Sequence, residues 1–357
     1  MNRHLRDRLV ALFSCVTLLS PLGAYAMRKP APARTDKVQR VQRVQQPIRF
    51  GVQRPTKLQR AAIDPHSFAR ALKGRSLAYN LPARPTTKLG RFVSVLGKMA
   101  GAVINAPKVG TPEGVLGQVQ NAKAYVDGVK IEDVQQGHLA DCFFVAALAS
   151  VAFTHPELLE KAITEKPDGT MSIRLYHQLP SGKYEADDVR IDKLVPMTNG
   201  RPTFARGANS TQMWPAWMQK AYAVEVSNAN GEQPNYQSIN NGGMPGDALS
   251  ALTGKPSHDI AISPSLGAGL YTSLQQAIKA KHPITALSPK KLPAGAPVHE
   301  WHTYSVMGVS THDGKQWVQV RNPWGYSEPG DPNGGDGIFE ITLEDFQKSF
   351  TTVSIGG

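Results

Sequence analysis

Apolar and polar residues alternate in several distinct ways along the chain, and from about Tyr125 onward the patterns predict a compact α+β domain. The run CFFVAALASVAF (142–153) is apolar on every side, which is typical of a helix buried all round. MSIRLYH (171–177) and YEADDVRID (184–192) alternate apolar and polar residues on either side of a Pro-Ser-Gly turn. This arrangement predicts a β-hairpin.

The second half of the domain predicts further helices and a second hairpin. In chain order they are a helix at 214–226, loops marked by Gly242, Gly243 and Gly246, a helix at 270–280, a hairpin formed by 301–310 and 315–322 around Asp313-Gly314, and a short helix at 343–350 that closes the chain.

The first 26 residues have the pattern of a secretory signal peptide. MNRHLRDR is basic, the following apolar run is too short to span a bilayer, and Ala24-Tyr25-Ala26 is an A-x-A cleavage site. A lipoprotein signal ending at Cys15 is an alternative. Either way we expect an exported protein, secreted or held in the periplasm or cell envelope.

Residues 27–115 predict an arm that precedes the domain at 116–357. Residues 27–60 are rich in Pro, Gln and Arg, with the repeat VQRVQRVQQ, and contain too few large apolar residues to build a core, so we expect a disordered or extended segment. Helical spacing returns at 65–80 and 88–104, and the apolar stripe of the latter needs a partner surface.

The charge is unevenly divided along the chain. The formal net charge is +12, but residues 27–100 contain 17 Lys/Arg and two acids, whereas residues 101–357 contain 20 Lys/Arg and 25 acids. A basic arm next to a mildly acidic body suggests that the arm docks on its own domain or on an anionic surface. We expect no nucleic-acid partner, because Phe50 is the one aromatic residue in 27–60.

Cys142 is the one cysteine that remains once the signal peptide is removed. A thiol attacks a carbonyl as the thiolate, which needs a lowered pKa. Gly137 and Asp141 break or cap the chain just before Cys142 and so place it at a helix N-terminus. A cysteine in an apolar helix is more often an inert core residue. The segment alone therefore leaves both interpretations open.

His302 and Asn322 lie at the open end of the second predicted hairpin, where an asparagine oxygen can orient an imidazole. Side chains alternate between faces, so the two share a face only if the loop has an odd number of residues, such as three or five with a bulge at Gly314. A two-residue Asp-Gly turn would separate them. The simpler alternatives are a strand-end histidine and a turn-forming asparagine.

An oxyanion formed during attack on a carbonyl needs hydrogen-bond donors. Gln136 lies on the loop before Cys142, and its amide can point to the same place as the Cys142 backbone N–H. Gln135 is the competing candidate.

Five segments, in order, resemble the protease core of the calpain family of papain-like cysteine peptidases. They are QGHLADCF (136–143), WPAWMQKAYA (214–223), HTYSV (302–306), RNPWG (321–325), and the closing pair GIF (337–339) and EDF (344–346). The resemblance covers about residues 120–355. It implies a two-lobed fold, with a helical lobe that carries the cysteine and an antiparallel β lobe that carries the histidine and asparagine.

The resemblance also implies roles for individual residues. Cys142 becomes the nucleophile, His302 the general base and acid, Asn322 the residue that orients the histidine, and Gln136 the oxyanion donor. Trp324 shields the His–Asn pair from water. The chain departs from the family pattern at Ala140, Phe143 and Trp301, where the family has Gly, Trp and Gly. The last of these is expected to narrow the primed side of the cleft.

In the family, two calcium ions switch the core on, and part of one calcium loop survives here as Val126, Gly128 and Asp133. Its fourth ligand should be an acid near Trp214, where this chain has Gln212. The second loop offers Glu328, Asp331 and Asp336 without the family spacing. We therefore expect that no cofactor is required, and Val126, Gly128 and Asp133 are the candidate ligands if calcium binds.

Together these patterns predict an exported cysteine endopeptidase that acts on proteins or peptides and is made as a precursor inhibited by its own arm. The alternative is an inactive protease fold that the basic arm anchors to an anionic envelope surface. Acyl transfer by the same triad is a third possibility, because an amine can resolve an acyl-enzyme as well as water can.

Overall fold

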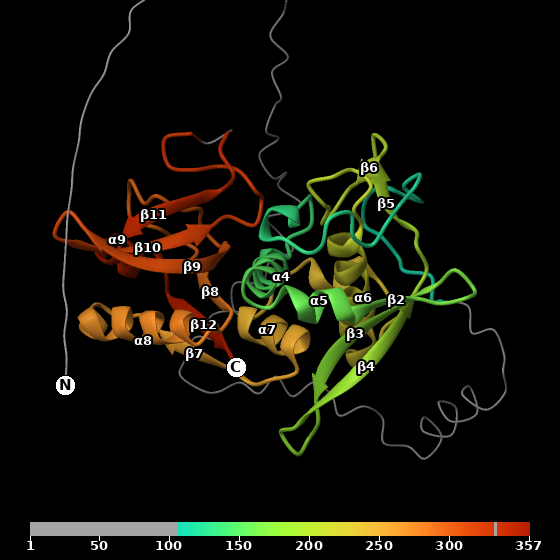
Figure 1. Cartoon of the computed structure of the whole chain (residues 1–357), viewed down its shortest axis with the longest axis horizontal. Helices are drawn as coiled ribbons and strands as arrows, with labels where there is room; N and C mark the ends of the chain where they lie inside the picture. The colour runs from blue at the N-terminus through green and yellow to red at the C-terminus, as the bar shows by residue number, and fades with distance from the viewer. Residues whose placement is uncertain (1–105, 332–333) are drawn as a thin grey trace, which may run out of the picture. The chain divides into compact units, whose positions relative to one another are not determined.

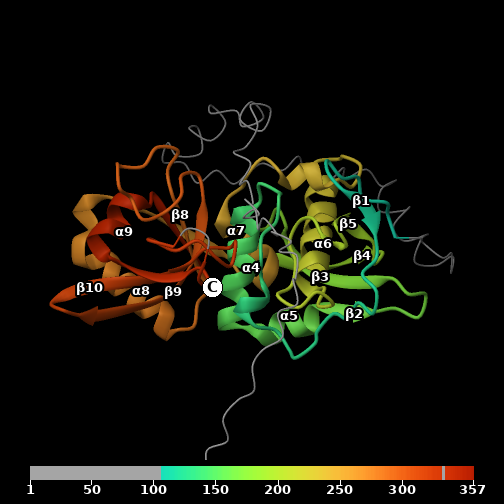
Figure 2. The same cartoon turned by 90° about the horizontal axis from the view of Figure 1, so that it is seen from above.

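The computed structural model describes residues 106–331 and 334–357. These residues form two lobes, each with its own hydrophobic core, which meet along the central helix α4 (Cys142–Thr154) (Figures 1 and 2). The predicted signal peptide, the predicted helices at 65–80 and 88–104, and the predicted arm up to residue 105 lie outside the described residues.

The N-terminal lobe packs helices around α4 and carries two small antiparallel sheets (Figure 1). Its other helices are α5 (Pro156–Ala162), α6 (Trp214–Ala229) and α7 (Pro245–Thr253), with 3-10 turns η1 (Ile131–Asp133) and η2 (Tyr236–Ile239). Its strands are β1 (Val115–Gly117), β5 (Val195–Thr198) and β6 (Arg201–Pro202) in one sheet, and β2 (Ile163–Glu165), β3 (Met171–Gln178) and β4 (Tyr184–Ile191) in the other.

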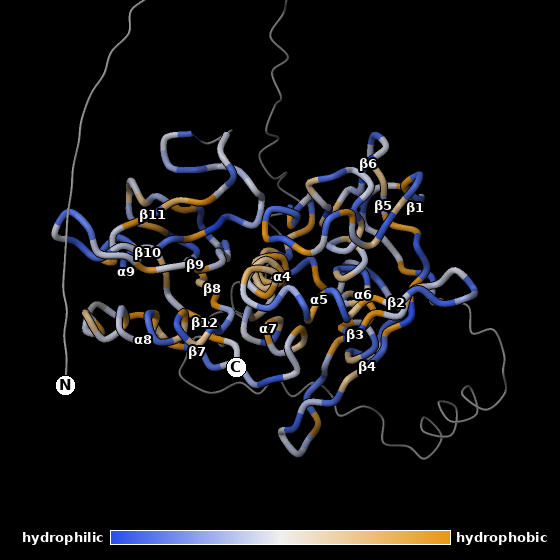
Figure 3. Tube along the Cα trace, viewed as in Figure 1, coloured by the Kyte–Doolittle hydropathy of each residue, from blue (hydrophilic) through white to orange (hydrophobic). Residues whose placement is uncertain are grey.

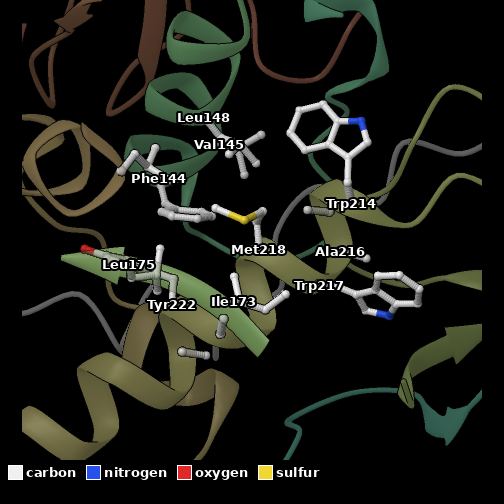
Figure 4. Close-up of a cluster of buried hydrophobic side chains, with 14 of the residues drawn as sticks. Phe144, Val145, Leu148, Ile173, Leu175, Trp214, Ala216, Trp217, Met218 and Tyr222 are labelled. Atoms are coloured by element: carbon white, nitrogen blue, oxygen red, sulfur yellow. The ribbon is translucent and has the colours of Figure 1, made fainter. Parts of the chain in front are cut away.

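The core of this lobe lies between α4, α6 and the β3–β4 hairpin (Figure 4). Phe144 of α4 stacks on Tyr222 of α6, with ring centroids 4.3 Å apart. Ile173 and Leu175, on the inward face of β3, are fully buried beside them. The apolar run 142–153 is therefore a buried helix, and the first hairpin forms, both as predicted.

Helix α4 is mostly apolar, and most of it is coloured towards orange in Figure 3. Among the described residues, no single helix has both the length and the composition to cross a membrane. The sharply bent pair of α4 and α5 passes that test only in combination, and α4 is buried from Phe143 to Ala152.

The C-terminal lobe is a six-stranded antiparallel sheet in the order β11-β10-β9-β8-β12-β7, flanked by helices α8 and α9 (Figure 1). Its elements, in chain order, are β7 (Ser257–Ala261), η3 (Pro264–Leu266), α8 (Gly267–Lys279), β8 (Ile284–Leu287), β9 (Thr303–His312), β10 (Lys315–Arg321), β11 (Ile338–Thr342), α9 (Leu343–Ser349) and β12 (Thr352–Gly356).

One sequence-based prediction about this region is wrong and another is incomplete. Gly246 lies in the first turn of α7 rather than in a loop, because its missing side chain leaves room for the Ser257 hydroxyl, which donates to the Gly246 carbonyl at 2.7 Å. The helix predicted at 343–350 forms as α9, but the few residues after it, for which no element was predicted, also have a regular structure. They form strand β12, entirely buried between β8 and β7, and its five residues were too few to give a strand pattern.

The described residues that precede 116 also pack on the N-terminal lobe. Val109 is 1% exposed and belongs to the N-terminal core. The backbone N–H of Gly110 donates to the carbonyl of Pro234 at 2.8 Å. This stretch is therefore fastened to the lobe.

Polar contacts from α4 join the two lobes. The Ser150 hydroxyl accepts from the Ile284 backbone N–H at 2.7 Å and donates to the Ile284 carbonyl at 3.0 Å. Ser305 of β9 donates to the carbonyl of Ala146 at 2.8 Å. These bonds fix the position of the C-terminal sheet along α4.

Replacing Ser150→Ala should lower the free energy of unfolding by about 1–3 kcal/mol, because the buried Ile284 N–H loses its partner. Ser273→Ala is the matched control, since this half-exposed hydroxyl bonds only within its own helix and should change stability by less than about 0.5 kcal/mol. Urea unfolding measures both. Equal losses in the two variants would contradict the interlobe role.

Candidate active site

Cys142 is the first residue of α4 and follows a tightly packed loop. A Cβ atom on Gly137 would lie 2.2 Å from the Thr203 carbonyl oxygen, so only glycine fits in this loop. Asp141 precedes the helix, and its carbonyl oxygen accepts from the Phe144 and Val145 backbone N–H groups. Its carboxylate does not cap the helix as predicted, because it accepts from Gln219 of α6 at 2.6 Å.

The Cys142 thiol faces the start of β9 in the opposite lobe. Its Sγ lies 3.9 Å from the Thr303 hydroxyl and 4.0 Å from the Trp301 carbonyl oxygen, the two residues that flank His302. In the described part of the chain, no hydrogen bond joins Sγ to His302. The two lobes therefore bring the thiol to the histidine's neighbourhood without closing the pair.

His302 and Asn322 are both buried and form a direct hydrogen bond. Nε2 of His302 lies 2.9 Å from Oδ1 of Asn322, which leaves Nδ1 as the nitrogen for the thiol. Oδ1 also accepts from the Trp324 backbone N–H at 3.1 Å. The predicted orienting contact is thus present.

The hairpin brings His302 and Asn322 onto one face although its turn has two residues, which the sequence analysis had expected to separate them. Its turn has only two residues, Asp313 and Gly314, both with positive φ. The register then slips by one residue, because Gln319 pairs with Gly308 whereas Val320 pairs with Val306. The requirement for an odd-numbered loop is therefore wrong.

The bulge that produces this slip leaves Met307 as the extra residue of β9. Met307 packs against the core of the N-terminal lobe. This one extra residue places His302 and Asn322 on the same face of the hairpin, and its side chain packs β9 against the N-terminal lobe.

Aromatic rings enclose His302. Its ring centroid lies 4.7 Å from that of Trp324 and 5.1 Å from that of Tyr304. Trp324 is thus positioned beside the His–Asn pair, where the sequence analysis expected a shield against water.

Two residues in this environment were missed. His299 lies with its ring 6.0 Å from His302, packs on Trp324, and pairs through Nε2 with the Ser327 hydroxyl at 3.0 Å. Ser288 accepts the His302 backbone N–H at 2.9 Å. The spacing of His299 three residues before His302 was the only available signal, because the Ser288 contact depends on strand pairing.

Burial controls the protonation of the pair. It raises the pKa of the Cys142 thiol to about 11. It also lowers the pKa of His302 to about 4, although the Asn322 hydrogen bond opposes this shift. In this arrangement both groups are neutral near pH 7.

Gln136 is buried, and its amide is engaged within the loop. Nε2 donates to the Leu139 carbonyl at 2.8 Å, and the backbone N–H donates to the Pro323 carbonyl at 2.8 Å. The neighbouring Gln135 pairs through its backbone with Arg206 and lies against Gly325. Gln136 and Gln135 thus both contact the RNPWG segment (321–325). To donate to an oxyanion, the Gln136 side-chain amide must give up its hydrogen bond to the Leu139 carbonyl.

Trp301, in the position where the family pattern has glycine, adopts φ +52°, a left-handed conformation that is unfavourable for a bulky residue. Its backbone N–H donates to the Pro289 carbonyl at 3.0 Å, and Lys290 Nζ lies 6.0 Å from the centroid of its ring. These contacts hold the carbonyl of Trp301 near the thiol.

The acids predicted for calcium make hydrogen bonds within the chain. Asp133 Oδ2 accepts from the Lys130 backbone N–H at 2.9 Å, and the neighbouring Gln212 presents an amide to the same carboxylate. In the second loop, Glu328 Oε1 accepts from the backbone N–H groups of Asp336 and Gly337.

One other group of potential metal ligands occurs among the described residues. His177, Asp187 and Glu225 have ligand atoms within 4.8 Å of one another on β3, β4 and α6. None of them belongs to the loops in which calcium was considered.

Comparison with known proteins agrees with this geometry. A family model described as "Calpain family cysteine protease" matches residues 116–334. The mouse calpain-1 catalytic subunit is 27% identical over 279 residues, which cover 66% of this chain and 36% of that protein. Calpain-type cysteine protease DEK1 of Arabidopsis thaliana is 29% identical over 259 residues, or 62% of this chain and 11% of that protein. The chain thus spans well under half the length of these relatives.

The buried His302 predicts a pH dependence of stability. Its pKa falls from about 6.5 unfolded to about 4 folded, so between these values the unfolded chain binds more protons and stability is lost as pH falls. The unfolding free energy of the wild type minus that of His302→Gln should drop by about 3 kcal/mol from pH 7 to pH 4. Subtracting the value for the variant cancels the contribution of Asp141, whose raised pKa makes the protein more stable as the pH falls. If the difference in unfolding free energy between wild type and variant did not change with pH, the lowered pKa of His302 would be contradicted.

Proposed function

Because this chain belongs to the calpain family of cysteine proteases, we propose that it is an exported cysteine endopeptidase whose catalytic residues are Cys142, His302 and Asn322. The observation that carries the proposal is the meeting of the two lobes. The thiol at the start of α4 faces the start of β9, where His302 is held by Asn322.

In the proposed reaction, Nδ1 of His302 takes the proton of the Cys142 thiol, and the sulfur attacks the peptide carbonyl carbon. The Cys142 backbone N–H and the Gln136 amide donate to the oxyanion. His302 returns the proton to the amine as the C–N bond breaks. Water then attacks the thioester, gives its proton to His302, and releases the acid and the thiol. An amine in place of water would give acyl transfer.

Forming the reactive ion pair requires a small closure of the site. Both groups are neutral in the described arrangement because burial disfavours each charge. When Sγ reaches hydrogen-bond distance of Nδ1, each charge compensates the other. Substrate that bridges the two lobes would supply the binding energy for this step.

We further propose that catalysis needs no calcium, since the acid expected near Trp214 is Gln212 and the other candidate oxygens bond to the chain itself. The signal-peptide pattern of residues 1–26 supports export. Proteins or peptides are the proposed substrates.

A thiol-directed covalent probe tests the catalytic assignment. We expect one equivalent of label on the wild type, none on Cys142→Ser, and labelling about 100-fold slower on His302→Ala, because the imidazole generates the thiolate. Mass spectrometry gives the stoichiometry and rate. Hydrolysis of an unfolded protein should fall in parallel.

Thr303→Val is the matched control for this experiment, since it removes a hydroxyl near the thiol without removing the base. A calcium chelator should leave the labelling rate unchanged. Slow alkylation that ignores His302 would instead favour the alternative function, an inactive protease fold held to an anionic surface by the basic arm.

The arm before residue 106 is proposed to inhibit the enzyme until it is removed. The support is electrostatic, because residues 27–100 carry a large positive charge and residues 101–357 a small negative one. The apolar stripe at 88–104 would bury against the domain.

Removing the arm should raise activity. A chain starting at residue 106 keeps the buried Val109 and should cleave an unfolded protein about tenfold faster than the chain starting at residue 27, equivalent to about 1.4 kcal/mol of arm docking. High salt should narrow the difference. Equal rates, with no cleavage of the longer form between residues 60 and 106, would refute the proposal.

A further inference from the structure

A polar cavity of about 350 Å³ lies in the N-terminal lobe between β6 and the start of α6. The side chains and backbone that line it include those of Gln135, Arg201, Arg206, Asn209, Ser210 and Gln212. The lining contains two guanidinium groups and no carboxylate. The cavity is therefore positively charged.

The two arginines carry charges that nothing on their own surface neutralises. Neither Arg201 nor Arg206 takes part in an ion pair with any described residue. Arg206 is half-buried, and burial together with the charge of Arg201 lowers its pKa. A partly buried cation beside another cation is costly unless an anion joins them.

Gln212 is a buried polar residue of the lining, with 1% of its surface exposed. Its side-chain amide interacts with the Asp133 carboxylate. The two arginines are therefore the charged groups of the lining that no ion pair within the described residues neutralises.

The loop that carries these groups is already ordered. A Cβ atom on Gly207 would lie 2.5 Å from the Gln212 carbonyl oxygen, so the loop closes tightly at this glycine. The Asn209 side chain accepts from both the backbone N–H and the hydroxyl of Thr211. Little ordering entropy would be lost on binding.

The cavity is connected to the active site through Gln135. Its backbone N–H donates to the Arg206 carbonyl, and its carbonyl accepts from the Arg206 N–H, at 3.1 and 3.0 Å. Its side chain packs against Gly325, the residue after Trp324. A Cβ atom added to Gly325 would lie 3.1 Å from Cγ of Gln135. The next residue, Gln136, is the proposed oxyanion donor.

We propose that this cavity binds a carboxylate of the substrate, supplied by an aspartate or glutamate side chain a few residues from the cleaved bond. The inference rests on the proposed function. Guanidinium groups bind carboxylates through paired charge-assisted hydrogen bonds, and the side-chain NH2 group of Asn209 offers a further donor. The basic arm is a poor occupant, because its charge has the same sign as the cavity.

The test measures binding to Cys142→Ser, both in the full-length chain and in the chain that starts at residue 106, so that it depends neither on turnover nor on removal of the arm. Fluorescent peptides with glutamate or glutamine at successive positions are compared by anisotropy. At one position glutamate should bind about tenfold more tightly than glutamine, and Arg206→Gln should abolish that preference. Arg201→Gln, an exposed substitution that leaves the Gln135 pairing intact, should reduce the preference if Arg206→Gln fails to fold.

Arg174→Gln is the matched control, because it removes one positive charge from an exposed ion pair with Asp188 on the β3–β4 hairpin. It should keep the glutamate preference. Equal binding of all glutamate and glutamine pairs would overturn the inference, even if the wild type labels and cleaves normally. If the cavity binds inorganic phosphate through Arg206 but no peptide position prefers glutamate, the anion is not a substrate carboxylate and the inference is overturned.

Discussion

Helix α4 has no solvent-facing side between Phe143 and Ala152, because the N-terminal core packs on one part of it and strands β8 and β9 pack on another. The two lobes therefore meet on this helix. Its backbone and the Ser150 hydroxyl supply polar contacts between the lobes, and the loop before the helix supplies another through Gln136 and Pro323. The position of Cys142 relative to β9 follows from this packing.

The same burial that fixes the geometry sets the chemistry at rest. Desolvation keeps both the thiol and the imidazole neutral, whereas the proposed reaction needs them charged and in contact. In that proposal the charges form only when the two groups meet, because each charge then compensates the other. The aromatic rings of Trp324 and Tyr304 lie around His302 and contribute to its burial.

Local patterns were sufficient to predict the helices and hairpins whose periodicity is long or uniform, such as α4 and β3–β4. They failed where a tertiary contact decides the conformation. Gly246 is helical because Ser257 approaches it, and the five residues of β12 form a strand because β7 and β8 flank them. The carboxylate of Asp141 bonds to Gln219, far away in sequence, and not to the helix it precedes.

For the site, the alternation of side chains along a strand correctly predicted that His302 and Asn322 must share a face. It wrongly predicted that an odd-numbered loop would bring this about. His302 and Asn322 had to share a face, and the Asp-Gly turn alone would have separated them. The bulge at Met307 has no local signature, because its stabilisation comes from the other lobe. His299 and Ser288 were missed because their contacts with Ser327 and His302 depend on how the strands and loops of the C-terminal lobe pack together.

The central place of β12 also orders events during synthesis. Strand β8 pairs with β9 on one side and with β12 on the other, so the sheet that carries His302 remains open until residues 352–356 have left the ribosome. The N-terminal lobe is made of contacts closer in sequence and can fold earlier, with α4 half covered. The nascent chain thus contains Cys142 in a nearly finished lobe before the sheet next to His302 is complete.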